Sequence, residues 1–283
     1  MSQFIIENQF LKASFDALGA ELQSLIKIEN KAELIWQAKQ EYWPRHAPIL
    51  FPIVGRLKDN TYTYKGVKYE MNQHGFARDA VFKVEHHTQT EIVFLLTENK
   101  NTLTQFPFKF EFRVIYTLNG LHLNQAFSVV NTNITNMHCS FGGHPAFNAN
   151  PIHSYQLKFT PTNSNQLLYL LKEGSIGSIG NHFEMNTLAL SETLFDADAL
   201  IFEKTNDLII TLMKNETPIL AIATCDMPYL GIWSKPTAPF VCIEPWQGWA
   251  DLDTHTGEIE LKSGIVEIEA GKQCNRKFEI RVY

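Results

Sequence analysis

The sequence has few cysteines and lacks a long apolar run. Its four cysteines among 283 residues form no C-x-x-C pair, and their gaps are too wide for a zinc ribbon. We therefore expect reduced, mostly buried thiols instead of a disulfide framework. No apolar stretch approaches the roughly 18 residues of a membrane helix. Because the N-terminus reaches Glu7 without a basic region, we expect no signal peptide and predict a soluble, cytoplasmic protein without membrane contact.

An excess of basic charge is also missing. The formal net charge is −6, from 24 basic and 30 acidic residues. No run of Lys and Arg occurs, and the densest cluster, residues 27–39, is interleaved with Glu29 and Glu33. Proteins bind nucleic acids through a basic stripe that displaces counterions. We therefore expect no nucleic-acid partner and favour an uncharged small molecule, while the sequence carries no signal for an oligomeric state.

Several catalytic signatures are absent as well. The chain has no G-x-S-x-G, which argues against a serine hydrolase. It has neither a P-loop nor a glycine-rich dinucleotide fingerprint, and its ten histidines include no H-x-H or H-E-x-x-H spacing. Neither a nucleotide cofactor nor a cupin-type metal site is therefore expected.

Alternation of apolar and polar residues dominates what is present. Segments 110–116 and 121–129 alternate on either side of Asn119-Gly120, which is the strongest short signal for a β-hairpin. Segments 81–85 and 92–96 form a second candidate pair joined by polar residues. Further candidate strands are 155–159, 208–212, 219–223, 230–233, 240–243, 259–262, 266–269 and 278–282.

Helical periodicity is scarce. The best helical candidate is Lys31–Tyr42, which Pro44 would end, although Glu33–Trp36 within it is also compatible with a short strand. Closely spaced strands without helices between them predict an antiparallel all-β fold, and so many strands favour two stacked sheets. Since no repeat or low-complexity linker interrupts the chain, we predict one domain over residues 1–283.

Reactive side chains lie among Gly, Pro and aromatic residues in three segments, 48–78, 140–148 and 242–251. His74 precedes a glycine and His144 follows two, so each is either a turn residue or a group held close to a ligand. Glu244 ends an apolar strand beside Trp246 and Trp249. Partial desolvation there would raise its pKa and suit it to act as a base, whereas a solvated strand-end carboxylate is the plainer alternative.

Two arginines, Arg56 and Arg78, follow apolar or small-residue segments. They are either surface charges or buried groups whose partners are substrate hydroxyls. Histidines, an acid, arginines and tryptophans on a β scaffold suggest a sugar, because flat rings stack on a pyranose while polar side chains bind its hydroxyls. We take both arginines, Trp246 and Trp249 as candidate sugar contacts.

Four motifs make the chain resemble a known family. They are FPIVGR at 51–56, NQHGFAR at 72–78, GGHPAFN at 142–148 and IEPWQGW at 243–249. Their order and spacing, over nearly the whole chain, resemble the aldose 1-epimerase (galactose mutarotase-like) family, in particular its LacX-like branch. The resemblance implies a large antiparallel β-sandwich, the galactose mutarotase-like supersandwich. It also implies a reaction without metal or other cofactor, the interconversion of the α and β anomers of a free aldohexose.

The resemblance also implies roles for individual residues. By similarity, Glu244 is the catalytic base, His144 the general acid and His74 a second active-site histidine, while Arg56 binds substrate hydroxyls. An aspartate after the central strands also binds the sugar in this family. Our candidate for it is Asp198, with Asp196 as the competing register.

The implied chemistry is a ring opening and closure. Glu244 would take the proton of the anomeric hydroxyl while His144 protonates the ring oxygen as the C1–O5 bond breaks. The open aldehyde would rotate about C1–C2 and close again with the two roles reversed. We expect the acid to be an imidazolium near neutrality, which the ordinary histidine pKa of about 6.5 permits.

The substrate is less defined than the reaction. The better-studied branch has an Asn-His-x-Tyr-type motif around the acid, where this chain has Gly143-His144-Pro145-Ala146, so a preference for galactose does not follow. A related branch acts on hexose 6-phosphates, and three arginines are candidates for holding a phosphate, namely Arg45, Arg56 and Arg78.

Two other function classes stay open. A glycoside hydrolase needs two carboxylates flanking the bond, and Glu244 with Asp251 is a candidate pair, although it leaves the two histidines unexplained. A non-catalytic sugar-binding or sensing protein on the same fold is the second alternative, since a fold does not determine function.

Overall fold

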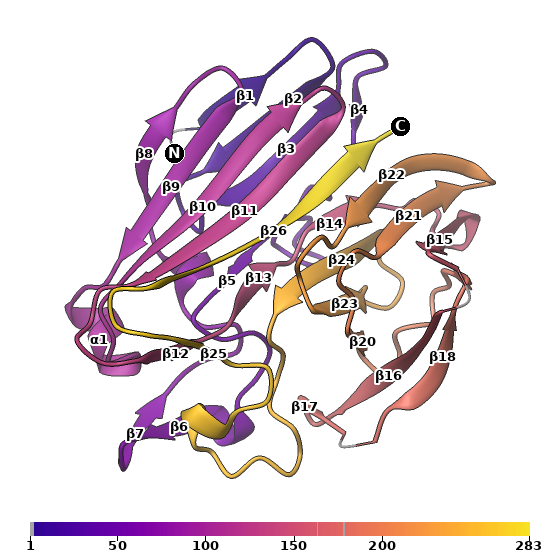
Figure 1. The fold of residues 1–283 in the computed structure, drawn as a ribbon. Coiled ribbons are helices and arrows are strands. Elements are labelled where there is room, and N and C mark those ends of the chain that lie inside the picture. The colour runs from indigo at the N-terminus through magenta and orange to yellow at the C-terminus, as the bar shows by residue number, and fades with distance from the viewer. Residues whose placement is uncertain (1–2, 163, 178) are drawn as a thin grey trace.

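Two nine-stranded antiparallel sheets dominate the computed structural model, which describes residues 3–162, 164–177 and 179–283 (Figure 1). The first contains the two hairpins predicted above. Across it, the strands are β19 (Thr187–Ala189), β15 (Tyr155–Thr160), β21 (Ile209–Lys214), β22 (Thr217–Ala223), β26 (Gln273–Val282), β11 (His122–Asn131), β10 (Phe110–Asn119), β9 (Glu91–Thr97) and β8 (Lys83–His87). We call it the long-strand sheet because its strands β10, β11 and β26 each have 10 residues.

The second sheet lies below the long-strand sheet in the view of Figure 1. Across it, the strands are β17 (Ser175–Ile176), β16 (Ser164–Lys172), β20 (Leu200–Glu203), β23 (Tyr229–Trp233), β24 (Phe240–Gln247), β13 (Phe141–Gly143) and β5 (Ile49–Leu50). Two further strands pair from the side, β14 (Ala146–Asn148) with β24 and β18 (Asn181–Met185) with β16. All the pairings in this sheet are antiparallel, so the predicted all-β antiparallel sandwich is confirmed.

Smaller elements complete the chain. A four-stranded sheet contains β1 (Gln3–Glu7), β2 (Leu11–Asp16), β3 (Glu21–Lys27) and β4 (Ala32–Glu33). Two ribbons are formed by β6 (Thr61–Tyr64) with β7 (Val67–Glu70), and by β12 (Met137–Cys139) with β25 (Val266–Ile268). The single α-helix of the described ranges is α1 (Lys100–Gln105). Short 3-10 turns are η1 (Lys58–Asn60), η2 (Ala77–Asp79), η3 (Ile152–Ser154) and η4 (Ile259–Leu261).

Both predicted hairpins are present. Strands β10 and β11 pair with Asn119 opposite His122, so the two turn residues are Gly120 and Leu121, one position later than the expected Asn119-Gly120. Strands β8 and β9 also pair, although β8 extends to His87 and so includes two histidines that were expected in the connection. The strand expected at 259–262 is wrong, because η4 occupies that place. That residues 1–283 form one domain stays a prediction.

The helix predicted over Lys31–Tyr42 is also wrong, whereas the alternative of a short strand within Glu33–Trp36 agrees with the structure. The first part of the segment is extended, with β4 at its start and a bridge between Ile35 and Phe147, and residues 40–42 form a turn. A side chain explains the difference: the carboxylate of Glu33 accepts the backbone N–H of Leu25 at 3.0 Å and of Ile35 at 2.9 Å. It also accepts the hydroxyl of Ser24. The partners on β3, Ser24 and Leu25, hold the segment extended beside that strand.

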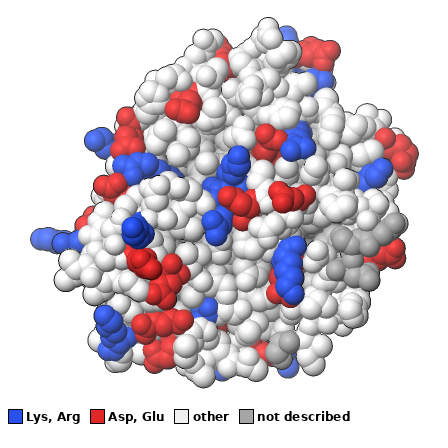
Figure 2. Space-filling model, viewed as in Figure 1, with Lys and Arg blue, Asp and Glu red and all other residues white. Residues whose placement is uncertain are grey.

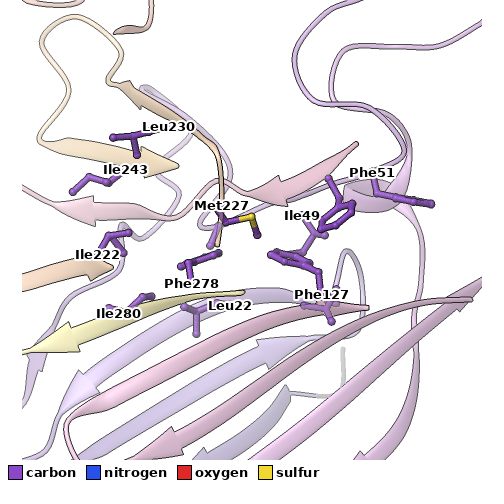
Figure 3. Packing of buried hydrophobic residues seen from close by; sticks show 14 of the residues in the cluster. Leu22, Ile49, Phe51, Phe127, Ile222, Met227, Leu230, Ile243, Phe278 and Ile280 are labelled. Atoms are coloured by element: carbon purple, nitrogen blue, oxygen red, sulfur yellow. The ribbon is translucent and has the colours of Figure 1, made fainter. Parts of the chain in front are cut away.

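Apolar side chains fill the space between the two large sheets. Figure 3 shows Ile243 and Leu230 of the second sheet together with Ile222, Phe278 and Ile280 of the long-strand sheet. Because successive residues of a strand point to opposite faces, the neighbours of Ile243 along β24 point away from this core. The outer face of the second sheet therefore offers polar positions that the sandwich core does not require.

Two further observations concern the helices of the described residues and the charges on one face of the molecule. No helix in these ranges is long and apolar enough to cross a membrane. Figure 2 shows basic and acidic side chains intermingled on the face in view, without a continuous basic stripe on that face.

Candidate active site

One strand register builds the centre of the site. Strand β24 pairs with β14 and β13 through Ala146–Cys242 and Gly142–Trp246. Both pairs belong to a single register, which places His144, between those two strands, opposite Glu244. Directly opposite residues of antiparallel strands are neighbours on one face. Accordingly, His144 Nε2 lies 3.2 Å from Glu244 Oε2.

Glycines let a tryptophan lie flat beside this pair. A Cβ on Gly142 would stand 2.6 Å from Cδ1 of Trp246, and a Cβ on Gly231 would stand 2.3 Å from its Cη2. Real Cβ atoms do not approach other atoms so closely, so these positions require glycine while Trp246 keeps its place. The indole therefore covers the backbone of β23 and β13 and forms one wall of the site.

The pair opens into a cavity of about 360 Å³. This volume lies within the range of small-molecule sites. Seven of the eight residues expected from the sequence line the cavity: Arg56, His74, Arg78, His144, Asp198, Glu244 and Trp246. The remaining lining residues are Trp43, Gly55, Gln73, Leu171, Gly174, Ala199, Ile201, Trp233 and Ala250.

The eighth expected residue, Trp249, lies outside the cavity lining. Its side chain is 3% exposed, and its indole N–H donates to the hydroxyl of Ser263 at 3.1 Å. The ring packs against Tyr229, with centroids 4.6 Å apart. The physical reason is the backbone at Gly248, where a φ of +99° ends the alternation of β24 before Trp249 is reached.

Of the two candidate aspartates, Asp198 lines the cavity and Asp196 does not. Asp198 has a φ of +75°, a conformation that costs energy for a residue with a Cβ. Its Oδ1 accepts the N–H of Ala199 at 2.8 Å, a local hydrogen bond that makes this conformation accessible to aspartate. The turn thereby directs a carboxylate to the rim of the cavity.

His74 is held by a reciprocal contact with Gly55. The backbone N–H of His74 donates to the carbonyl of Gly55 at 2.8 Å, and Nδ1 of His74 accepts the N–H of Gly55 at 3.1 Å. Nδ1 thus carries no proton, and the neutral ring has its N–H at Nε2. Burial lowers the pKa of His74 well below its usual value, and His144 and nearby arginines lower it further. His74 is therefore a neutral hydrogen-bond donor.

This geometry depends on the glycine that follows His74. His74 and Gly75 have φ values of +67° and +70°. A Cβ on Gly75 would stand 2.2 Å from the carbonyl oxygen of Phe51, so no other residue fits. The sequence left His74 open between a turn residue and a ligand-binding one, and the structure shows that it is a turn residue that also lines the cavity.

His144 is enclosed by aromatic rings. Trp43 stacks on it with ring centroids 4.9 Å apart and an interplanar angle of 27°, and Trp233 meets it edge to face at 6.0 Å. The ring is 8% exposed. Burial lowers the pKa of His144 to about 3, which overturns the expectation of an ordinary imidazolium near neutrality.

Glu244 has the opposite shift. It is 2% exposed, and burial raises its pKa well above the usual carboxyl value, with the charge of Asp198 raising it further. The two shifts favour a carboxylic acid facing a neutral imidazole. Such a pair carries the same number of protons as a carboxylate facing an imidazolium, so one proton moving across the contact interconverts the two forms.

Two arginines, Arg56 and Arg78, line the cavity as well. Nη2 of Arg78 donates to the carbonyl of Gln73 at 2.8 Å, whereas its buried Nε has no hydrogen-bond partner in the described residues. Burial and the charge of Arg45 lower the pKa of Arg78. Arg45 itself pairs with Asp79 at 2.8 Å and does not line the cavity.

A buried ion pair supports the cavity from behind. Nζ of Lys262 donates to Oδ1 of Asp251 at 2.9 Å and to the carbonyl of Trp249 at 2.7 Å. Oδ2 of Asp251 accepts the N–H of Lys58 at 2.9 Å, and the N–H of Asp251 donates to the carbonyl of Arg56 at 3.0 Å. Asp251 does not line the cavity, so the structure does not bring it together with Glu244 as a glycosidase pair.

Two tryptophans of the site, Trp43 and Trp233, were not among the residues expected from the sequence. Trp43 directly follows the segment Lys31–Tyr42 that was a helix candidate, and no periodicity pointed to it. Trp233 stands opposite Cys242 in the pairing of β23 with β24, on the same face as Glu244. Only the register between strands, which the sequence does not contain, could have found it.

A β-sandwich that carries a buried carboxylate–imidazole pair in a cavity of this size belongs to the class of proteins suited to acid–base chemistry on a small molecule. Comparison with known families makes the class specific, because the model of the aldose 1-epimerase family matches residues 2–264. The chain belongs to the aldose 1-epimerase family, which is a family of isomerases. The resemblance noted in the four sequence motifs is thereby confirmed.

Individual relatives cover nearly the whole chain. The plasmid-encoded protein LacX of Lactococcus lactis subsp. lactis is 30% identical over 294 aligned positions, covering 98% of each chain. A galactose mutarotase related enzyme from Lactobacillus acidophilus is 40% identical, with a TM-score of 0.96 over 100% of this chain and 97% of that one. A galactose mutarotase-like protein from Lactobacillus casei is 30% identical, with a TM-score of 0.93 over 100% of both chains. The fold is the galactose mutarotase-like sandwich.

Proposed function

We propose that this protein is a mutarotase that interconverts the α and β anomers of a free aldohexose. One observation carries the proposal: the contact of 3.2 Å between His144 Nε2 and Glu244 Oε2, within a cavity sized for a single sugar. Ring opening needs one group that accepts the proton of the anomeric hydroxyl and another that protonates the ring oxygen. A carboxylate and an imidazole side by side supply both groups. The 40% identity to a galactose mutarotase related enzyme also supports the proposal.

In the proposed reaction, Glu244 removes the proton of the anomeric hydroxyl. His144 gives a proton to the ring oxygen as the C1–O5 bond breaks, and a free aldehyde forms. Rotation about C1–C2 turns the other face of the aldehyde toward the ring hydroxyl. Closure then returns the proton from the ring hydroxyl to His144 and the proton from Glu244 to the new anomeric oxygen.

The protonation state of the pair follows from burial. In the empty cavity the acid of Glu244 and the neutral ring of His144 are favoured. We assign the reactive state to the form in which that proton has moved to His144, leaving a carboxylate beside an imidazolium. Sugar hydroxyls that donate to Glu244 stabilise this form, because hydrogen bonds to a carboxylate lower its pKa. No proton is exchanged with solvent.

The other lining residues hold the sugar. His74 donates from Nε2, Arg56 and Arg78 donate to hydroxyls, and Asp198 accepts from them. The flat ring of Trp246 packs on the apolar face of the pyranose. Trp249 has no part in binding, because it lies in the core behind the cavity.

A sugar with an anionic substituent, such as a hexose 6-phosphate, is a second candidate substrate. The buried Nε of Arg78, without a partner in the described residues, favours it. A phosphate oxygen would satisfy that donor, and arginine is well suited to phosphate because of its planar set of N–H groups. On this hypothesis, Arg78→Gln lowers kcat/KM for glucose 6-phosphate far more than for glucose.

Saturation-transfer NMR between the two anomers tests the proposed function directly. Wild-type protein should accelerate exchange of glucose, galactose or glucose 6-phosphate, and the three rates rank the substrates. Glu244→Gln keeps the shape of the site but loses the base, so exchange should fall by about 10² to 10⁴. The matched control is Glu269→Gln, the same change at an exposed surface position, which should leave the rate unchanged.

Two results would overturn the proposal in different ways. If Glu244→Gln kept the wild-type rate, Glu244 would not be the base. If sugars shifted protein resonances without any acceleration of exchange, the protein would be a sugar-binding or sensing protein on the same fold.

A further inference from the structure

Three side chains that are common metal ligands converge at the floor of the site. Nitrogen of His144, sulfur of Cys242 and a carboxylate oxygen of Glu244 all lie within 4.8 Å of one another. All three residues are buried. Cys242 and Glu244 are two residues apart on β24 and so share a face, and His144 stands opposite Glu244. Among the described residues, no other group of three or more such ligands is gathered this closely.

We propose that this triad, His144, Cys242 and Glu244, binds a zinc-class divalent cation, and that the bound cation blocks the acid–base pair. The inhibitory consequence rests on the proposed mutarotase function, whereas the binding itself does not. The triad thus gives the site a sensitivity to metal that the isomerisation does not require.

The distances suit a tetrahedral ion. With bonds of about 2.0 to 2.1 Å to nitrogen and oxygen, such an ion holds these two donors about 3.3 Å apart. His144 Nε2 and Glu244 Oε2 already lie 3.2 Å apart. A bond of about 2.3 Å to sulfur requires the sulfur about 3.6 Å from either donor. The sulfur of Cys242 lies within 4.8 Å of both donors, so it has to come closer to them by at most about 1 Å.

Charge and donor type select the cation. A thiolate and a carboxylate together offset the two positive charges, so the complex is neutral in a site with little water. Nitrogen, sulfur and oxygen donors suit Zn²⁺ and Co²⁺, whereas Mg²⁺ and Ca²⁺ prefer oxygen ligands alone. The cavity beside the pair leaves space for water as a fourth ligand.

Binding is a ligand exchange without electron transfer. Bonds form from the metal to nitrogen, sulfur and oxygen, while the thiol proton of Cys242 and the proton held between His144 and Glu244 leave for solvent. The lone pairs that would exchange protons with a sugar are then donated to the metal. Anomer exchange must stop while the cation is bound.

Cobalt absorption tests binding independently of activity. Co²⁺ bound to a thiolate gives a charge-transfer band in the near ultraviolet, and we expect one equivalent to saturate this band in the reduced wild-type protein. Cys242→Ala should abolish it. The matched control is Cys139→Ala, the same change at a buried cysteine of β12 outside the triad, which should keep the band. A wild-type protein without the band, or a band that persists in Cys242→Ala, would overturn the proposal.

Inhibition provides the second arm. Zn²⁺ should abolish anomer exchange by the wild type, and Mg²⁺ at the same concentration should not. Relative to its own metal-free rate, Cys242→Ala should need more than about tenfold higher Zn²⁺ for half inhibition, because one ligand is lost. Equal inhibition of both proteins would refute the triad. If the metal-free protein showed no exchange at all, the proposed function would fail while cobalt absorption still decided the metal site.

Discussion

The protein contains two buried pairs of a carboxylate and a nitrogen base, and the two carboxylates, Glu244 and Asp251, are close in the sequence. The pairs differ in how far their hydrogen bonds are satisfied. In the first, Asp251 and Lys262, both oxygens of the acid accept hydrogen bonds and the ammonium has a second acceptor in the carbonyl of Trp249. In the second, Glu244 and His144, His144 Nδ1 lacks a hydrogen-bond partner in the described chain, and Glu244 Oε2 has only its contact of 3.2 Å with His144 Nε2. Only the second pair opens to the cavity.

The difference separates a structural pair from a reactive one. A buried charge with all its hydrogen bonds made is fixed in one protonation state and holds the backbone around it. A buried pair with hydrogen bonds left unmade is unstable in its charged form, so a ligand that supplies those bonds shifts its protons. The pair of Asp251 and Lys262 thus stabilises the fold, whereas the pair of Glu244 and His144 is suited to react.

The largest effect is expected on stability when one partner of the structural pair, Asp251 and Lys262, is removed. Asp251→Asn leaves the ammonium of Lys262 buried without a counter-charge, which costs about 3 to 5 kcal/mol of unfolding free energy. The double variant Asp251→Asn with Lys262→Met removes both charges and should recover most of that loss. Urea unfolding of the three proteins measures the effect. A loss below about 1 kcal/mol in the single variant would mean that this pair does not hold the fold.

Removing the carboxylate of the reactive pair, Glu244 and His144, should raise stability instead of lowering it. The pKa of Glu244 is raised in the folded protein, so its ionisation favours the unfolded state as pH rises above the unfolded value of 4.5 toward the folded one. Gln has no such ionisation. Glu244→Gln should therefore raise the melting temperature, and the gain should be larger at pH 8 than at pH 5, as thermal unfolding at the two values would show.

A carboxylate with a lowered pKa provides the contrast. The pKa of Glu85 is lowered by its hydrogen bond to Arg113, so its ionised form favours folding above the unfolded pKa. Glu85→Gln should lower the melting temperature slightly at pH 8 rather than raise it. The same direction of change in both variants would contradict the assignment of raised and lowered pKa values.

The two shifts of the reactive pair also predict the dependence of kcat/KM on pH. The active pair holds two protons in all, so it persists from the lowered pKa of His144, about 3, up to the raised pKa of Glu244. We expect no inflection near 6.5, the ordinary histidine value. The alkaline limb should report Glu244. A loss of activity centred at 6.5 on the acid side would show that His144 titrates as a solvated imidazole.

The sequence predicted which residues form this site better than it predicted their protonation states. Motifs led to Glu244, His144 and His74 because they are local. The protonation of His144 depends on its burial and on its contacts with the rings of Trp43 and Trp233, which reach it from other parts of the chain. Long-range packing of this kind leaves no periodic trace in a sequence.

Errors of the same origin affected the fold. The alternation of β10 and β11 was visible because each strand buries one face along its whole length. The segment around Glu33 was open between a helix and a short strand, and its partners on β3 decide for the extended chain. Trp249 was expected at the sugar, but the φ of +99° at Gly248 ends the alternation of β24 before Trp249 is reached. Turns and side-chain partners distant in sequence decided both cases.

The smallest expected effect concerns Trp43, whose ring stacks on His144 of the reactive pair. The structural pair, Asp251 and Lys262, contains no aromatic ring and serves for comparison. The face of the Trp43 indole lies on His144 and attracts a positive charge, so it favours the imidazolium by about 0.5 to 1 kcal/mol. Trp43→Leu should lower kcat about twofold to fivefold and shift the acid limb of kcat/KM to lower pH. Trp43→Phe should restore part of both, because a smaller aromatic face remains. Trp249→Phe, outside the cavity, should lower stability with no shift of the limb; an equal shift in that variant would show that general packing, not the stacked indole, sets the proton affinity of His144.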